Sequence, residues 1–174
     1  MNNEADLTTR PATPNYDPLL HIVLHQPEIP YNAGNIGRTC VAVGAKLWMV
    51  EPLGFQITDY YLRRAGMDYW PLLEFEVVPS WTTLQEKLAG HRFWFFSKKA
   101  ERSYASVGYE RGDVLVFGCE SAGLPDELWN ADPKTALRFP SREAVRSLNL
   151  SNCAAIAMYE ALRQWGVADD ALRS

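Results

Sequence analysis

Cysteine and histidine are scarce in this sequence, with three of each among 174 residues. Cys40, Cys119 and Cys153 are widely spaced and odd in number, so they do not indicate a disulfide framework. No cysteines and histidines stand at the short spacings of a metal site. Cys119 also has no histidine nearby in the sequence to activate it as a nucleophile. The sequence therefore predicts no disulfides, no bound metal and no covalent catalysis by cysteine.

Long hydrophobic runs are also absent. The longest falls well short of the roughly 18 residues that span a membrane, and the first residues lack the basic and apolar regions of a signal peptide. Apolar residues at 47% and charged residues at 22% are ordinary for a globular protein. A chain of this length forms one domain with a continuous core. We expect a soluble, cytoplasmic protein with no membrane partner.

The sequence has no strong excess of either charge. Its formal net charge is −4, from 21 acidic and 17 basic residues. Segments 1–18 and 166–174 hold five of the acidic and two of the basic residues. The rest of the chain therefore has 16 acidic and 15 basic residues. Bulk charge alone would therefore not bind nucleic acid, but a local basic face remains open. Its candidates flank the predicted strands: Arg38, Arg63, Arg64, Lys98, Lys99, Arg102, Arg138, Arg142 and Arg146.

The chain divides into a leader, one domain and a short tail. Residues 1–18 are predicted to be a disordered leader, since prolines stand among polar residues without apolar periodicity. Short β-rich runs alternate with helical patterns over the domain at 19–166, and 167–174 form the C-terminal tail. We predict strands at 21–25, 46–50, 74–78, 93–97, 114–117 and 136–139. Helices are predicted at about 36–43, after Pro125 and at about 150–165, with a helical or irregular piece at 60–65. A further helix is predicted that Ser80 could cap and Gly90 could end.

The predicted strands are brief and continuously apolar, as at 114–117. Strands covered on both faces have this pattern, so we predict an α/β fold class, a parallel sheet flanked by helices on both faces. Ligands bind beyond the carboxyl ends of the strands in such sheets. Three loops of unusual content leave there, after His25, Phe117 and Phe139, and we expect the chemistry to lie in them.

The last predicted helix carries several small residues. They permit close approach of another helix, from the same chain or from a second subunit, and we favour self-association. These residues are Ala154, Ala155, Ala157 and Ala161.

The first loop, residues 26–38, joins two asparagines to an arginine. We predict that Asn32 and Asn35 cap the helix, which places Arg38 in its first turn. An arginine is unfavourable near the positive end of a helix dipole, so this position indicates an anionic partner. An ordinary turn followed by a solvated arginine explains the loop equally well. The loop has no glycine-rich phosphate-binding pattern.

The loops after Phe117 and Phe139 are polar, and ordinary structural roles can explain their residues when each is taken singly. Gly118 at a strand end lets a ligand approach the backbone, and Glu120 follows it closely. Taken singly, Glu120 is a cap or an ion-pair partner, and Ser147 and Ser151 are caps. Two stretches with paired cations, at 62–70 and 98–102, suit either phosphate contact or a solvated surface.

Taken together, four motifs resemble those of the SPOUT class of RNA methyltransferases, specifically its family of tRNA 2′-O-methyltransferases that act at the wobble nucleotide. They stand in the family's order across nearly the whole predicted domain. The motifs are Asn32-Ala-Gly-Asn-Ile-Gly-Arg38, Leu62-Arg-Arg-Ala-Gly-Met-Asp-Tyr-Trp70, Phe117-Gly-Cys-Glu-Ser-Ala-Gly-Leu-Pro125 and Arg146-Ser-Leu-Asn-Leu-Ser-Asn152. This sequence departs from the common pattern at Gly37 and Cys119 and in its long leader.

The resemblance implies an enzyme with a C-terminal trefoil knot that works as a homodimer, with an active site drawn from both subunits. It implies methyl transfer from S-adenosyl-L-methionine to the 2′-hydroxyl of the wobble cytidine or modified uridine of tRNA, in leucine tRNAs, with S-adenosyl-L-homocysteine as product. The RNA partner would be the anticodon stem-loop. The alternatives are a 2′-O-methyltransferase for another tRNA or rRNA position, and a catalytically silent RNA-binding homologue.

The resemblance also implies roles for particular residues. Arg38 would favour loss of the hydroxyl proton by electrostatic stabilisation, because an arginine remains protonated and is a poor base. The remaining expected catalytic residues are Asn32, Glu120 and Asn149. Cofactor contacts are expected at Phe96, Gly118, Phe139, Ser147 and Leu148, and contacts with the substrate RNA at Arg63, Arg64, Lys99 and Arg146.

Overall fold

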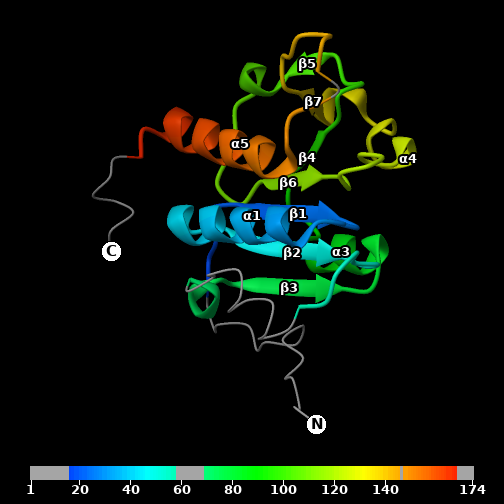
Figure 1. Cartoon of the computed structure of the whole chain (residues 1–174). Helices are drawn as coiled ribbons and strands as arrows, with labels where there is room; N and C mark the ends of the chain where they lie inside the picture. The colour runs from blue at the N-terminus through cyan, green and yellow to red at the C-terminus, as the bar shows by residue number, and fades with distance from the viewer. Residues whose placement is uncertain (1–15, 58–68, 146, 168–174) are drawn as a thin grey trace.

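The computed structural model describes residues 16–57, 69–145 and 147–167. They form one sheet of seven strands in the order β3-β2-β1-β6-β4-β7-β5, and all neighbouring pairs are parallel (Figure 1). The predicted leader as far as residue 15, the piece at 60–65, the tail from residue 168, and Arg63, Arg64 and Arg146 lie outside the described residues. The strands are β1 (His21–His25), β2 (Lys46–Val50), β3 (Phe75–Val78), β4 (Phe93–Phe96), β5 (Arg102–Ser103), β6 (Val114–Phe117) and β7 (Ala136–Arg138).

Six of these strands confirm the predictions, three with the predicted bounds and three shortened by one residue at one end. Strand β5 was missed. It has only two residues, whose register pairs Arg102 with Leu137 and Ser103 with Arg138. A two-residue strand has no periodicity of its own, so only its neighbour β7 defines it.

Helices cover both faces of the sheet, as predicted. They are α1 (Pro30–Val43), α3 (Trp81–Lys87), α4 (Asp126–Trp129) and α5 (Leu150–Trp165), with 3-10 turns at Trp70–Leu72, Tyr104–Ser106 and Pro133–Thr135. Alternate residues of β1 enter different cores: Ile22 packs with α1 and α5, whereas Val23 packs with α3 and α4. None of the helices in the described ranges is both long and apolar enough to cross a membrane.

Helix α1 begins earlier than predicted. Pro30 is its first residue and Ile29 its N-cap, without a side-chain hydrogen bond. Proline suits this position because its fixed φ is helical and its missing N–H needs no partner there. Asn32 and Asn35 therefore lie inside the helix and do not cap it. Arg38 lies in the third turn, so the prediction that set it against the helix dipole was wrong.

Helix α5 has the predicted bounds, but its cap differs. Asn149 is the N-cap: its Oδ1 accepts a hydrogen bond from the Ser151 N–H at 2.8 Å, so Ser151 is not the cap. Ala154, Ala157 and Ala161 are fully buried in the chain's own core, where α5 packs beside α1. The small-residue face therefore serves packing within the chain.

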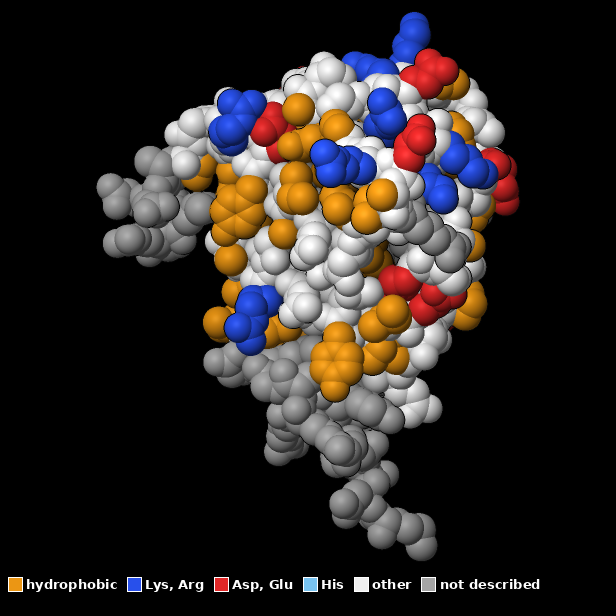
Figure 2. All heavy atoms as spheres, turned by 45° about the horizontal axis from the view of Figure 1, so that its top comes forward, with side chains coloured by type: hydrophobic (Ala, Val, Ile, Leu, Met, Phe, Trp, Pro, Cys, Tyr) orange, Lys and Arg blue, Asp and Glu red, His pale blue; other side chains and the backbone are white. Residues whose placement is uncertain are grey.

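A different face of α1 and α5 carries exposed apolar side chains. Ile156 and Tyr159 on α5 are 38% and 54% exposed, and Tyr31 on α1 is 69% exposed. Figure 2 shows apolar side chains gathered on the face that these helices form.

His21 lies at the amino end of β1 and is buried. Its Nδ1 accepts a hydrogen bond from Trp48 Nε1 at 3.0 Å, and the ring of His91 lies edge-on to it at 4.7 Å between centroids. Burial, aided by His91 and Lys46, lowers the pKa of His21 to about 4. The fold therefore favours the neutral ring.

Lowering the pH should destabilise the fold through His21. The pKa of His21 in the folded state lies below the value near 6.5 expected in the unfolded chain. The neutral ring therefore contributes its full stabilisation to the fold above pH 6.5, and this stabilisation is lost as the pH falls towards 4. We expect a loss on the order of 3 kcal/mol in the free energy of unfolding. Urea unfolding at pH 7.5 and 4.5 checks this, with His21→Asn as a non-titrating control that keeps an acceptor for Trp48. An equal loss in the control would contradict it.

Candidate active site

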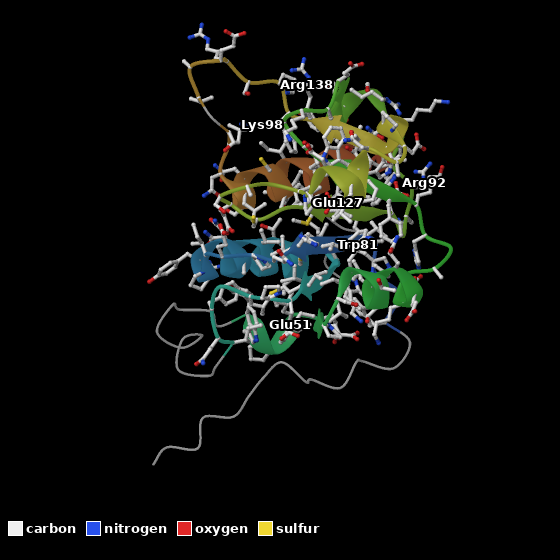
Figure 3. The ribbon with its side chains drawn as sticks, turned by 90° about the vertical axis from the view of Figure 1, so that its right-hand side faces the viewer. Glu51, Trp81, Arg92, Lys98, Glu127 and Arg138 are labelled. Carbon is white, nitrogen blue, oxygen red and sulfur yellow. The ribbon has the colours of Figure 1, made fainter. Side chains whose placement is uncertain are left out.

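A pocket of about 340 Å³ opens at the carboxyl ends of β1, β6, β4 and β7, where the sequence predicted the chemistry. Figure 3 looks onto this edge of the sheet. The volume lies within the range of small-molecule sites. Nine of the thirteen predicted site residues line the pocket: Asn32, Phe96, Lys99, Gly118, Glu120, Phe139, Ser147, Leu148 and Asn149.

Glu120 holds the backbone at the start of α1, whose N-cap Ile29 has no capping side chain. Its Oε2 accepts a hydrogen bond from the Glu28 N–H at 2.8 Å, and its Oε1 accepts one from the Ile29 N–H at 3.2 Å. A carboxylate is favourable beside the positive end of a helix dipole. All of these contacts use Glu120 as an acceptor, so they fix its position and that of the helix start.

A chain of side-chain hydrogen bonds continues from Glu120 across the pocket wall. Glu120 Oε1 accepts from Asn32 Nδ2 at 2.9 Å, and Asn32 Oδ1 accepts from Asn149 Nδ2 at 3.0 Å. Asn32 is buried, with 5% of its surface exposed. The chain joins the starts of α1 and α5 to the loop after β6. Three residues that the sequence predicted separately are thus one hydrogen-bonded unit.

Glu28 does not line the pocket, but it holds Ser121 in the wall, a role that was missed from the sequence. Its Oε2 accepts from the Ser121 N–H at 2.9 Å, and its Oε1 accepts from Ser121 Oγ at 2.6 Å. Each of the loops after β1 and β6 therefore donates hydrogen bonds to a carboxylate of the other: Glu120 accepts from the Glu28 backbone, and Glu28 accepts from Ser121. The pairing spans more than ninety positions, so only the parallel register of β1 and β6 brings it together.

Gly118 lies where the backbone folds back on itself. A Cβ atom there would come within 2.0 Å of the Gly123 carbonyl carbon and 2.1 Å of the Leu124 nitrogen. The turn is closed by the Gly123 N–H, which donates to the Cys119 carbonyl oxygen at 2.9 Å. Only glycine fits at this position, which keeps the turn tight and backbone groups accessible to the pocket.

Stacked aromatic rings form an apolar part of the pocket wall. Phe96 stacks on Phe117 at 4.5 Å between ring centroids and on Phe139 at 5.2 Å. The three rings come from the carboxyl ends of β6 and β4 and from the residue after β7. The pocket therefore combines flat apolar surface with backbone and amide groups, a mixture suited to an organic ligand with polar substituents.

Arg38 does not line the pocket of its own chain. It follows Asn32 by six positions, which places it about 120° away around α1. Its guanidinium carbon lies 4.8 Å above the ring of Tyr69. A Cβ on Gly37 would come within 2.8 Å of Leu73 Cδ2, so glycine there allows the segment from Tyr69 to Leu73 to pack closely on the helix.

The thiol of Cys153 also borders the pocket. Burial raises its pKa to about 11, so it stays protonated at neutral pH and is a weak nucleophile. Among the described residues, no group of three or more His, Cys, Asp or Glu side chains is placed to hold a metal ion.

Residues 19–159 match the SpoU rRNA Methylase family, and the chain belongs to this family of methyltransferases. A tRNA (cytidine(34)-2'-O)-methyltransferase of Methylovorus glucosotrophus is 43% identical over 147 residues, which are 84% of this chain and 96% of that protein. A solved structure described as giving insights into the 2-OH methylation of C/U34 on tRNA is 44% identical, with a TM-score of 0.79 over 84% of this chain and 96% of that chain. The AdoMet-bound rRNA methyltransferase of Sinorhizobium meliloti is 25% identical, with a TM-score of 0.73 over 86% of this chain and 61% of that chain. The resemblance inferred from the four motifs is confirmed.

Proposed function

We propose that this enzyme transfers a methyl group from S-adenosylmethionine to the ribose 2′-hydroxyl of nucleotide 34 of tRNA, a cytidine or modified uridine, in leucine tRNAs. The pocket at the carboxyl edge carries the proposal, because it gathers nine predicted site residues from four parts of the chain. The relatives that act on nucleotide 34 support the target. The reaction would take place in the cytoplasm, with residues 19–166 working as one domain.

The cofactor is proposed to bind along the aromatic wall and the turn at Gly118. The tight turn leaves backbone groups facing the pocket, and the rings of Phe96 and Phe139 offer a flat apolar surface. Ser147 and Leu148 also line the pocket and are proposed to contact the cofactor. When bound, S-adenosylmethionine supplies a methyl group on a positively charged sulfur, which is already a strong electrophile. The chain's own task is to align the ribose and strengthen its hydroxyl as a nucleophile.

Arg38 is proposed to stabilise the oxygen of the ribose as negative charge develops on it. Its guanidinium stays protonated at ordinary pH, so its role is electrostatic. The hydrogen-bonded unit of Glu120, Asn32 and Asn149 would position the ribose against the pocket wall. Because Arg38 lies on a face of α1 away from its own pocket, we propose that it serves the pocket of a second copy.

The homodimer is proposed to form through α1 and α5. Their outer faces carry Tyr31, Ile156 and Tyr159, which are exposed in a single chain, and Arg38 lies on the same helix as Tyr31. A trefoil knot is part of the proposal. The chain leaves β7 next to the sheet's edge and returns past the pocket to α5, which packs on α1 in the middle of the molecule (Figure 1).

Incubation with radiolabelled S-adenosylmethionine should label tRNA at nucleotide 34. The measurement is nuclease mapping, because a 2′-O-methyl group removes the hydroxyl that alkaline or nuclease cleavage needs. The expected substrates are leucine tRNAs isolated from cells without this protein, and a transcript with 2′-deoxy nucleotide 34 is the matched control. Label on ribosomal RNA or at another tRNA position would contradict the proposed target, and no label on any RNA would contradict methyl transfer itself.

A further inference from the structure

Two cations stand together at the mouth of the pocket. Lys98 follows β4 and Arg138 ends β7; these strands are neighbours, with Phe96 paired to Leu137 in register. Both side chains belong to exposed residues that line the pocket. Figure 3 shows them at the upper end of the carboxyl edge, whereas Glu127 and Glu51 lie further down. The two cations therefore lie on the same side of the pocket, at the ends of neighbouring strands.

The adjacent lysines differ in their partners. Lys99 Nζ contacts both carboxylate oxygens of Asp126, at 2.7 and 2.8 Å. Within the part of the chain that the structure describes, Lys98 and Arg138 form neither a hydrogen bond nor an ion pair with a side chain. Asp126 thus neutralises Lys99, while the charges of Lys98 and Arg138 remain available to a ligand.

We propose that Lys98 and Arg138 bind one backbone phosphate of the RNA strand that enters the pocket, beside the nucleotide to be methylated. This rests on the proposed function and deepens it. A guanidinium binds phosphate oxygens in a fork and an ammonium adds a point charge, so the pair suits a phosphate held between them. Their exposed position at the rim favours RNA over the carboxylate of the cofactor. Lys99 contacts Asp126 at the start of α4, and its predicted contact with RNA stays a prediction.

The test compares Lys98→Ala, Arg138→Ala, the double variant and, as the matched control, Lys134→Ala, which removes an exposed lysine that does not line the pocket. RNA affinity is measured directly with tRNA and an anticodon stem-loop over a range of salt concentrations, together with S-adenosylmethionine affinity by calorimetry. Each contacting cation releases counterions on binding, so losing it should reduce the slope of log K against log salt by about 0.7 to 0.9. The double variant should lose about 10-fold or more in RNA affinity at low salt, with Lys134→Ala within about 3-fold of the wild type.

Several results would overturn the proposal. Unchanged salt slopes in Lys98→Ala and Arg138→Ala would do so, as would an equal loss in Lys134→Ala. Weakened cofactor affinity with normal RNA affinity would assign the two cations to the cofactor carboxylate. Since the assay measures binding, it does not depend on which nucleotide is methylated. Reduced slopes would support the phosphate site even if mapping placed the methyl group elsewhere, and unchanged slopes in an enzyme that methylates nucleotide 34 would reject the phosphate site alone.

Discussion

Gly118→Ala is expected to abolish measurable binding of S-adenosylmethionine. The added Cβ would lie 2.0 Å from the Gly123 carbonyl carbon and 2.3 Å from its oxygen, so it meets backbone that no change of side-chain rotamer can clear. The turn at 118–124 must open to admit it, which moves the backbone groups proposed to hold the cofactor. Overpacking of this kind costs a few kcal/mol, and we expect affinity to fall by about 100-fold or more.

Isothermal titration calorimetry measures this loss, and Gly108→Ala is the matched control. A Cβ at Gly108 meets nothing within 4 Å, and its backbone does not require glycine. The control should therefore bind the cofactor as the wild type does. Far-UV circular dichroism of both variants separates a local change in the turn from loss of the fold. Near-normal affinity in folded Gly118→Ala would remove the turn from the proposed cofactor site.

The fold was largely predictable because it depends on local pattern. Runs such as Val114–Phe117 are continuously apolar, and only a parallel sheet covered on both faces explains several of them in a chain with intervening helices. The location of the pocket followed in turn, since parallel strands bring all their carboxyl ends to one edge. Ser80 was also readable as a cap, and its Oγ accepts from the Thr83 N–H at 3.1 Å.

The errors arose where distant segments decide local structure. The start of α1 was predicted six residues late, because the backbone at this start is held by Glu120, more than ninety positions away. The role of Glu28 was not predicted for the same reason, since its partner Ser121 lies in another loop. The ion pair between Asp126 and Lys99, in which Lys98 takes no part, could not be predicted from the sequence either. Each case is a long-range polar contact, which has no periodicity to reveal it.

Arg38→Ala is expected to retain the fold and cofactor binding but to lose methyl transfer by roughly 100- to 1000-fold, the usual cost of removing one group that stabilises a developing oxyanion. Arg38 is exposed, so its loss opens no cavity in the core. Transfer of radiolabelled methyl to tRNA at saturating cofactor measures the effect. Turnover close to that of the wild type would remove Arg38 from the reaction.

Mixing two inactive variants tests whether Arg38 acts across the dimer. In a dimer of one Arg38→Ala chain and one Gly118→Ala chain, the first contributes an intact pocket and the second an intact Arg38. If Arg38 serves its partner's pocket, one of the two sites in every mixed dimer is complete. Random reassociation of equal amounts makes half of the dimers mixed, so activity should return to about a quarter of the wild-type level.

The opposite result is equally definite, because an arginine that served its own pocket would leave both sites of the mixed dimer defective. Activity would then stay at the sum of the two backgrounds. Gel filtration of the mixture, with one chain tagged, checks that mixed dimers form and that Gly118→Ala still associates. Recovery would explain why Arg38 points away from the pocket in its own chain, over Tyr69, on the helix whose exposed Tyr31 belongs to the proposed interface. A residue that is catalytic only in the neighbouring subunit ties methyl transfer to dimer formation, so substitutions that weaken the α1 and α5 contact should lower turnover without altering the pocket itself.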